Sequence, residues 1–160
     1  MTYPEKLYLG EGGEVSADFR RPIGEPDLVL GSGTRVTYLA TGASTGGGFG
    51  LYHWEMGPKR HGAEPHLHRT FSESFYVLSG EVGLYDGDSW HDASGGDFIH
   101  VPPGGIHAFR NHSGAPVSML ILFAPGAPRE AYFEGLDDLD ALSDAQKADF
   151  LIAHDNIYIE

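Results

Sequence analysis

The chain has 160 residues, the size of one typical domain that buries a single core. Its formal net charge of −13 argues against nucleic acid and anionic membrane surfaces as partners, because the field of the molecule repels both. It contains no cysteine, which excludes disulfides, thiolate ligands and cysteine nucleophiles, so any metal must be bound by nitrogen and oxygen atoms.

The composition favours an all-β fold. A chain with 23 Gly, 10 Pro and 12% aromatic residues suits many short strands joined by tight turns. The N-terminal stretch MTYPEKLYLGEGGEV has no basic region followed by an apolar one, and the longest apolar run, Met119 to Ala124, is far shorter than a membrane span. We therefore expect a single-domain, cytoplasmic protein that does not bind membranes.

The first part of the chain, residues 1–33, is predicted to be an arm that packs on the domain, because glycine and proline interrupt its short apolar pieces. Residues 34–126 instead show repeated short strand patterns: TRVTYLA, FGLYHWEM, SFYVLSG, EVGLYDG, GDFIHV, HAFRN and PVSMLILF. Their spacing of roughly ten residues, with Gly, Pro or Asp at the joints, is typical of a β-sandwich or barrel.

Residues 127–160 differ in kind and predict a C-terminal helical segment. PREAYFEGL and LSDAQKADFLIAH have helical composition, and Ser143 followed by Gln146 fits a capping box that opens the last helix. We expect this helix to pack on the barrel through one apolar face, formed by Ala145, Ala148, Leu151 and Ile152. No internal repeat or linker indicates a second domain.

A His-x-His pair is the first feature with metal chemistry. In a strand, residues i and i+2 point to the same face, so His66 and His68 can present their imidazoles to one ion. Glu73 alternates along the strand with Phe75 and Val77, so its carboxylate is expected on the same, apolar face. A buried carboxylate without a positive partner is costly, and its position there indicates a cation.

A second segment, GGDFIHVPPGGIHAFRN, supplies another histidine. Its turn, residues 102–105, delivers His107 onto the next strand with Phe109 on the same face. A histidine directly after a rigid turn is pre-positioned, which limits the entropy lost when a metal binds.

Together the two segments resemble the motifs of the cupin family. The first cupin motif is a His-x-His pair, three or four residues, a glutamate, six residues and a glycine, and it is matched by His66, His68, Glu73 and Gly80. The second motif is matched throughout by Gly96, Pro102, Gly104, His107 and Asn111. One departure is Arg60, which stands where the first motif usually opens with glycine; because Gly62 is nearby, we expect an altered turn rather than a lost site.

This resemblance implies a jelly-roll β-barrel and a mononuclear metal site whose ligands are His66, His68, Glu73 and His107. Three imidazoles and one carboxylate leave about two positions open on an octahedral ion. The set suits one divalent transition metal, Fe, Mn, Ni, Co or Zn, and the sequence does not choose among them. The family also implies a homodimer, with the N-terminal arm as a strand-exchange element.

Aromatic and apolar side chains near the ligands predict a substrate cavity. On the strand before the His-x-His pair, either His53 and Glu55 or Tyr52 and Trp54 face inward, and we favour the second pair because small-molecule sites are mostly apolar. The expected substrate-binding residues are Tyr52, Trp54, Phe75, Phe109 and Met119. Since no cluster of Arg and Lys is present to hold phosphate, we expect an aromatic or conjugated, oxygen-bearing small molecule.

Within the family, the gap before Glu73 and the continuation ESFYVLSGEV are similar to quercetinase-type dioxygenases. That similarity implies that the enolic hydroxyl of the substrate binds the metal as its anion, that Glu73 takes the proton, and that dioxygen attacks the activated carbon. Two alternatives remain: a redox-neutral isomerase, epimerase or cyclase that uses the metal as a Lewis acid, and a non-catalytic cupin that binds a small ligand.

Overall fold

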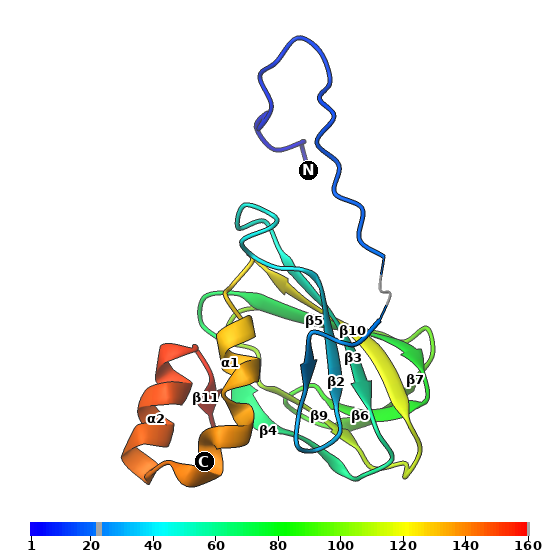
Figure 1. Ribbon diagram of the computed structural model, residues 1–160, viewed down its shortest axis with the longest axis vertical. Coiled ribbons are helices and arrows are strands. Elements are labelled where there is room, and N and C mark those ends of the chain that lie inside the picture. The colour runs from blue at the N-terminus through cyan, green and yellow to red at the C-terminus, as the bar shows by residue number, and fades with distance from the viewer. Residues whose placement is uncertain (22–23, 160) are drawn as a thin grey trace.

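A computed structural model describes residues 1–21 and 24–159, and its body consists of two facing antiparallel sheets (Figure 1). The first sheet has the strand order β1 (Leu28–Val29), β2 (Arg35–Ala40), β3 (Gly50–Met56), β10 (Val117–Ala124), β5 (Ser72–Ser79), β8 (Phe98–Val101). The second has the order β11 (Ile157–Tyr158), β4 (His61–Leu67), β9 (His107–Asn111), β6 (Glu81–Tyr85), β7 (Trp90–Ser94). This confirms the predicted all-β jelly-roll class.

Side-chain alternation explains why the core lies between the sheets. Along β10 every second residue is buried, and along β3 the buried positions alternate in the same way. The two strands pair so that Met119 lies opposite Trp54 and Ile121 opposite Tyr52, which joins their apolar faces into one surface. Burial of each such large side chain contributes about 1.5–3 kcal/mol to folding, so this surface fixes the register of the sheet.

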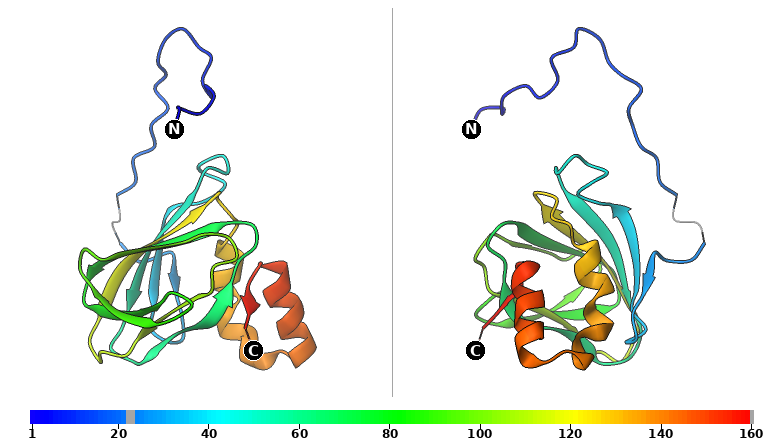
Figure 2. Two further views of the ribbon diagram at one scale, coloured as in Figure 1. Left: turned by 180° about the vertical axis from the view of Figure 1, so that it is seen from behind. Right: turned by 60° about the vertical axis from the view of Figure 1, so that its left-hand side comes forward.

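The C-terminal segment lies at one side of the sheets, with α1 and α2 next to each other (Figures 1 and 2). It comprises α1 (Glu130–Glu134), a 3-10 helix η1 (Leu136–Ala141), α2 (Asp144–Ala153) and the short strand β11. The capping box of Ser143 and Gln146 is present as predicted. In the described part of the chain, no helix has the length and apolar character needed to cross a bilayer.

The predicted packing face of α2 is confirmed only for Leu151, which packs against the core. Ala145, Ala148 and Ile152 are exposed, and Phe150 packs against the core in their place. The physical reason is area: the ring of Phe150 stacks on Tyr132 with centroids 5.8 Å apart, and it buries far more apolar surface than an alanine can.

The N-terminal arm packs on the body only in its last part. Residues 1–21 are exposed and extend away from the sheets (Figures 1 and 2). Contact with the body begins around β1, which pairs with β2, and Leu30 is buried in the core. The earlier expectation of packing therefore does not hold for residues 1–21, whose scattered apolar side chains form no continuous face to bury.

Candidate metal centre

The two motifs meet between the sheets. His66 lies on β4, His107 begins β9, and these two residues are direct partners in the β4–β9 pairing. His68 follows the end of β4, and Glu73 reaches the same point from β5 in the opposite sheet. All four side chains are buried, and they offer one ligand atom each within 4.8 Å of one another.

Glu73 lies at the centre of this cluster. Its Oε2 atom is 2.9 Å from Nε2 of His68 and 2.9 Å from Nε2 of His107. His68 and His107 therefore both direct their Nε2 atoms toward the same carboxylate oxygen of Glu73.

The other ring nitrogen of each histidine is already occupied. In all three residues Nδ1 faces a backbone carbonyl that accepts its hydrogen, so a neutral ring has its lone pair on Nε2. Without an ion, Nε2 of His68 and His107 donates a hydrogen to the ionised Glu73, and a bound ion would take the place of that hydrogen. The acceptors are the carbonyls of Glu64 for His66 (2.8 Å), Asp155 for His68 (2.6 Å) and Gly105 for His107 (3.0 Å). The backbone thus selects the tautomer that can ligate a metal through Nε2.

Burial and mutual contacts set the charges in the cluster. Burial, reinforced by the charge of His107, lowers the pKa of His66 to about 4, so this imidazole is neutral at pH 7. Burial alone would raise the pKa of Glu73, but its hydrogen bonds with His107 and His68 outweigh burial and lower the pKa. Burial likewise opposes the raised pKa of His107, which results from its contact with Glu73.

This donor set fits a divalent transition metal. Three Nε2 atoms and one ionised carboxylate converge in a buried space, and one divalent cation could accept a lone pair from each of the four groups. Nitrogen and oxygen donors of this kind suit Fe, Mn, Ni, Co or Zn. His66, His68, Glu73 and His107 are the residues that could hold the ion, as the sequence predicts.

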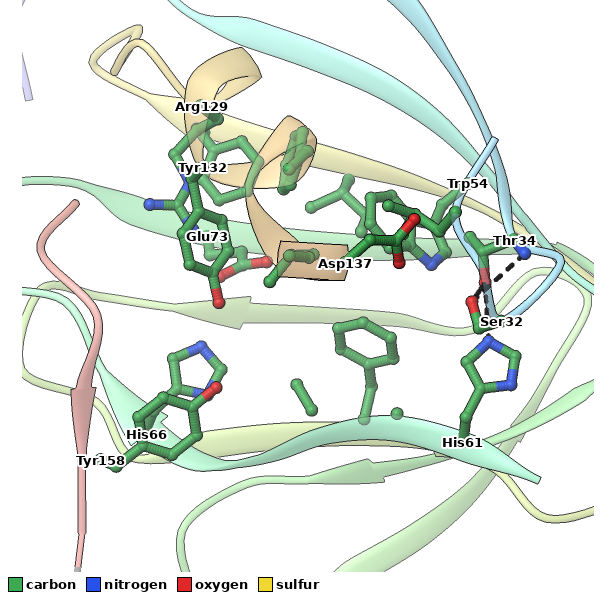
Figure 3. Close-up of a pocket in the computed structure, with 18 residues that line it drawn as sticks. Ser32, Thr34, Trp54, His61, His66, Glu73, Arg129, Tyr132, Asp137 and Tyr158 are labelled. Atoms are coloured by element: carbon green, nitrogen blue, oxygen red, sulfur yellow. Dashed lines mark hydrogen bonds between the residues drawn. The ribbon is translucent and has the colours of Figure 1, made fainter. Parts of the chain in front are cut away.

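A cavity of about 270 Å³ opens from this cluster (Figure 3). His66 and Glu73 lie at one end of it, and His61 lies at the other. Most of the wall is apolar or aromatic, and it includes Leu30, Trp54, Ala63, Phe109, Ile121, Phe123, Phe133 and Leu136. Such a wall binds a small apolar or aromatic ligand better than a highly charged one.

The expected substrate-binding residues divide into two groups. Trp54 and Phe109 line the cavity, whereas Tyr52, Phe75 and Met119 are buried in the core and are not part of its wall. Tyr52 donates its hydroxyl hydrogen to Glu130 at the start of α1. The inward pair on β3 is nevertheless Tyr52 and Trp54, as favoured.

The alternative inward pair, His53 and Glu55, is only half-buried on the opposite face of β3. The ring of His53 shares a hydrogen bond of 2.7 Å with Ser118 on the neighbouring strand. Alternation along β3 explains this arrangement, since Tyr52 and Trp54 occupy the positions that face the core.

Sequence reasoning missed the contribution of the C-terminal segment to the wall. Six lining residues follow the last barrel strand, namely Arg129, Tyr132, Phe133, Leu136, Asp137 and Tyr158. Arg129 is only 3% exposed and donates hydrogen bonds to the carbonyl of His154 (2.7 Å) and to Oδ1 of Asn156 (2.9 Å). No motif signals these residues, because their place depends on how the segment docks.

The end of the cavity remote from Glu73 carries a short polar chain. Ser32 donates to the hydroxyl of Thr34 at 3.0 Å, and Thr34 lies 2.6 Å from Nε2 of His61 (Figure 3). Nδ1 of His61 faces the carbonyl of Lys59, so Nε2 accepts the hydrogen of Thr34. His61 belongs to the cavity wall.

Comparison with known families gives a match over residues 52–123, to the family described as the cupin domain. Residues 52–123 are a cupin domain. The matched range contains both motifs and all four candidate ligands. The departure at Arg60 has a structural reading: a Cβ atom on Gly62 would lie 2.0 Å from the carbonyl oxygen of Phe109, so the required glycine is two residues later.

The chain is also similar to a curated enzyme. Quercetin 2,3-dioxygenase of Bacillus subtilis is 31% identical over 106 residues, which cover 64% of this chain and 31% of that enzyme. The chain thus spans about a third of the length of this relative.

Two solved structures share the fold. A sugar phosphate isomerase from a cupin superfamily, of Silicibacter pomeroyi, has a TM-score of 0.50 at 26% identity, covering 57% of this chain and 59% of that one. A predicted oxalate decarboxylase of Thermotoga maritima has a TM-score of 0.54 at 17% identity, covering 57% of this chain and 80% of that one. The second likeness shows the fold alone.

Proposed function

We propose that this cupin is a metal-dependent enzyme that cleaves a small aromatic or enolic substrate with dioxygen. The observation that carries the proposal is the buried cluster of three histidines and Glu73 at the end of an aromatic cavity. Such a site can bind a substrate oxygen next to a metal while the walls enclose the rest of the molecule. The similarity to quercetin 2,3-dioxygenase supports the same reaction class.

Glu73 is the proposed catalytic residue. A bound divalent transition metal supplies Lewis acidity and, where the ion is redox-active, reactivity toward dioxygen. Glu73 is held ionised within the cluster, so its carboxylate oxygen can accept the proton of an enolic hydroxyl placed at the cavity end. The three histidines stay in position through their Nδ1 hydrogen bonds.

The cavity wall is proposed to select the substrate. Trp54 and Phe109, whose rings are 6.2 Å apart in an edge-to-face arrangement, offer aromatic surface to a planar molecule. Burial raises the pKa of Tyr132, so its hydroxyl stays protonated and can hydrogen-bond to a substrate oxygen. The volume of about 270 Å³ is near the lower end for ligand pockets, which favours a compact substrate.

A redox-neutral reaction is the second candidate, supported by the 26% identity to the sugar phosphate isomerase. The metal would then serve only as a Lewis acid for an enolate. The cavity favours a substrate without phosphate, since Arg129 is the one Lys or Arg that lines it among the residues described. A non-catalytic binding protein, the third candidate, would show ligand-dependent thermal stabilisation without turnover.

Oxygen consumption by the metal-loaded protein tests the proposal. The probes are quercetin and smaller enolic compounds, each assayed in air and under nitrogen. Substrate-dependent oxygen uptake supports the dioxygenase. Turnover that proceeds equally without oxygen contradicts it and favours the isomerase, and stabilisation by a probe without any turnover favours the binding protein.

We also propose that the protein is a homodimer in which the N-terminal arm lies on a second copy. Several apolar side chains of the arm are exposed and are not buried against the barrel of their own chain: Tyr3, Leu7, Leu9, Val15 and Phe19. The outer face of the first sheet also exposes Tyr76, Leu78 and Phe98. Burying these two apolar surfaces against each other would remove both from water.

A further inference from the structure

The three histidines among the candidate ligands differ in the origin of the carbonyl that accepts their Nδ1 hydrogen. For His66 and His107 the acceptor lies two residues earlier on the same turn of chain. For His68 the acceptor is the carbonyl of Asp155, which lies 87 residues later. One ligand of the metal site is therefore oriented by a segment outside the cupin match.

Asp155 contacts the region around His68 through its side chain as well. Its Oδ2 atom accepts hydrogen bonds from the backbone N–H groups of Arg69 and Thr70, both at 2.8 Å, and from the hydroxyl of Thr70 at 2.7 Å. The carboxylate thus fixes the two residues after His68, while the carbonyl fixes the ring itself. Asp155 has φ of 53°, a left-handed conformation that Asn, Asp and Gly adopt most readily.

Both neighbours of Asp155 are tied to the buried Arg129. This guanidinium donates to the carbonyl of His154 and to the side chain of Asn156, and Asn156 in turn donates to the hydroxyl of Tyr132. Beyond Asn156 the chain pairs with β4, where Tyr158 lies opposite His66. The position of the Asp155 carbonyl is therefore determined from both sides.

We propose that Asp155 is a positioning residue for the ligand His68, so that the C-terminal segment, residues 154–158, sets the metal affinity of the site. This inference rests on the proposed metal site. The Asp155 carbonyl holds His68 in the tautomer whose Nε2 points to Glu73, 2.9 Å away. If this carbonyl is displaced, Nδ1 loses the partner that fixes the ring orientation, and Nε2 is no longer held toward the metal position. Loss of such a supporting hydrogen bond weakens metal affinity by about 10–100-fold.

The test is the affinity of the full chain for Co(II), measured by competition with a chromophoric chelator, together with the visible spectrum of the Co(II) form. Asp155→Gly keeps the carbonyl and tolerates the left-handed backbone, but it removes the carboxylate that ties Asp155 to Arg69 and Thr70, so the carbonyl is no longer held against the ring of His68. Asp155→Asn keeps one acceptor oxygen for this tie. Asp86→Gly is the matched control, because Asp86 accepts from the backbone of Asp88 and Ser89 in a turn that does not line this cavity.

We expect Asp155→Gly to raise the Co(II) dissociation constant by about tenfold or more and to alter the spectrum. Asp155→Asn should restore most of the affinity, and Asp86→Gly should match the wild type. Wild-type affinity and spectrum in a folded Asp155→Gly protein would overturn the inference. If Asp155→Gly does not fold, Thr70→Val, which removes one of the three donors to Asp155, decides by the same criteria. A wild-type protein that binds no Co(II) would instead contradict the proposed metal site.

Discussion

His66 and His107 are direct cross-strand partners on β4 and β9, and their ring centroids lie 4.4 Å apart. Facing residues of antiparallel strands have their side chains close together on the same side of the sheet. The pairing therefore brings a histidine from each motif to one point, and Glu73 of the opposite sheet meets both there. The metal site depends on the register of this one strand pair.

Burial of neutral His66 predicts a pH dependence of stability in the metal-free protein. Its pKa is lowered from 6.5 to about 4, so between these values the unfolded chain takes up a proton that the folded chain does not. The free energy of unfolding should therefore fall by about 3 kcal/mol from this group as the pH drops from 6.5 to 4. Urea unfolding at several pH values measures it, and an unchanged pH profile in His66→Gln would disprove the assignment.

Replacing Glu73 by Gln should separate metal binding from catalysis. The amide oxygen can still approach the ion, but it cannot accept the proton of an enolic hydroxyl. We expect much of the metal to be retained and turnover to fall by about 10²–10⁴-fold. Parallel metal analysis and rate measurement check this, and an unchanged rate would exclude Glu73 as the base.

Asn111, the last residue of the second motif, is expected to be structural. Its buried amide donates to the carbonyls of Gly57 (2.9 Å) and Ala115 (2.7 Å) and accepts from Ser113. Asn111→Ala leaves both carbonyls without this donor and should lower the free energy of unfolding by about 2–4 kcal/mol. Denaturant unfolding measures the loss.

Metal affinity provides the control for this assignment. Among the described residues, the amide of Asn111 bonds only to Gly57, Ser113 and Ala115, and none of these is a candidate ligand, so folded Asn111→Ala should bind metal as tightly as the wild type. A loss of metal without a loss of stability would contradict the structural role.

The N-terminal arm predicts the oligomeric state. If Leu9 and Phe19 of one copy are buried on another, sedimentation equilibrium should give the mass of a dimer for the full chain. The double variant Leu9→Asp and Phe19→Asp should dissociate more readily, because charge would be buried at the interface. A monomer at every concentration tested would rule out the dimer.

Much of the fold and the metal cluster could be predicted because they depend on local spacing. Strand alternation predicted the inward faces, and the resemblance to the cupin motifs predicted the candidate ligands His66, His68, Glu73 and His107. Parity identifies which side chains face inward, but not which of them border a cavity. For that reason Phe75 and Met119 were wrongly expected in the cavity wall. They belong to the core behind it.

The C-terminal contributions could not be predicted because they depend on long-range docking. The contact of Asp155 with His68 joins residues far apart in the chain, and no local pattern encodes it. The same holds for Arg129, which is buried together with its hydrogen-bond partners His154 and Asn156, and these partners follow the end of α2. The packing face of α2 was misjudged because residue spacing alone does not weigh the large area that Phe150 buries.

The metal content of the protein tests the central claim most directly. It should be measured on protein purified without a histidine tag or chelator, for the wild type, His66→Ala and His107→Ala. His91→Ala serves as the control, since His91 is an exposed histidine that bonds to Asp86.

We predict close to one transition-metal ion per chain in the wild type and the control, and less than roughly a tenth of that in the two ligand variants. Wild-type protein that holds no metal and cannot be loaded by reconstitution would contradict the account. Ligand variants that keep the full metal content would contradict it equally.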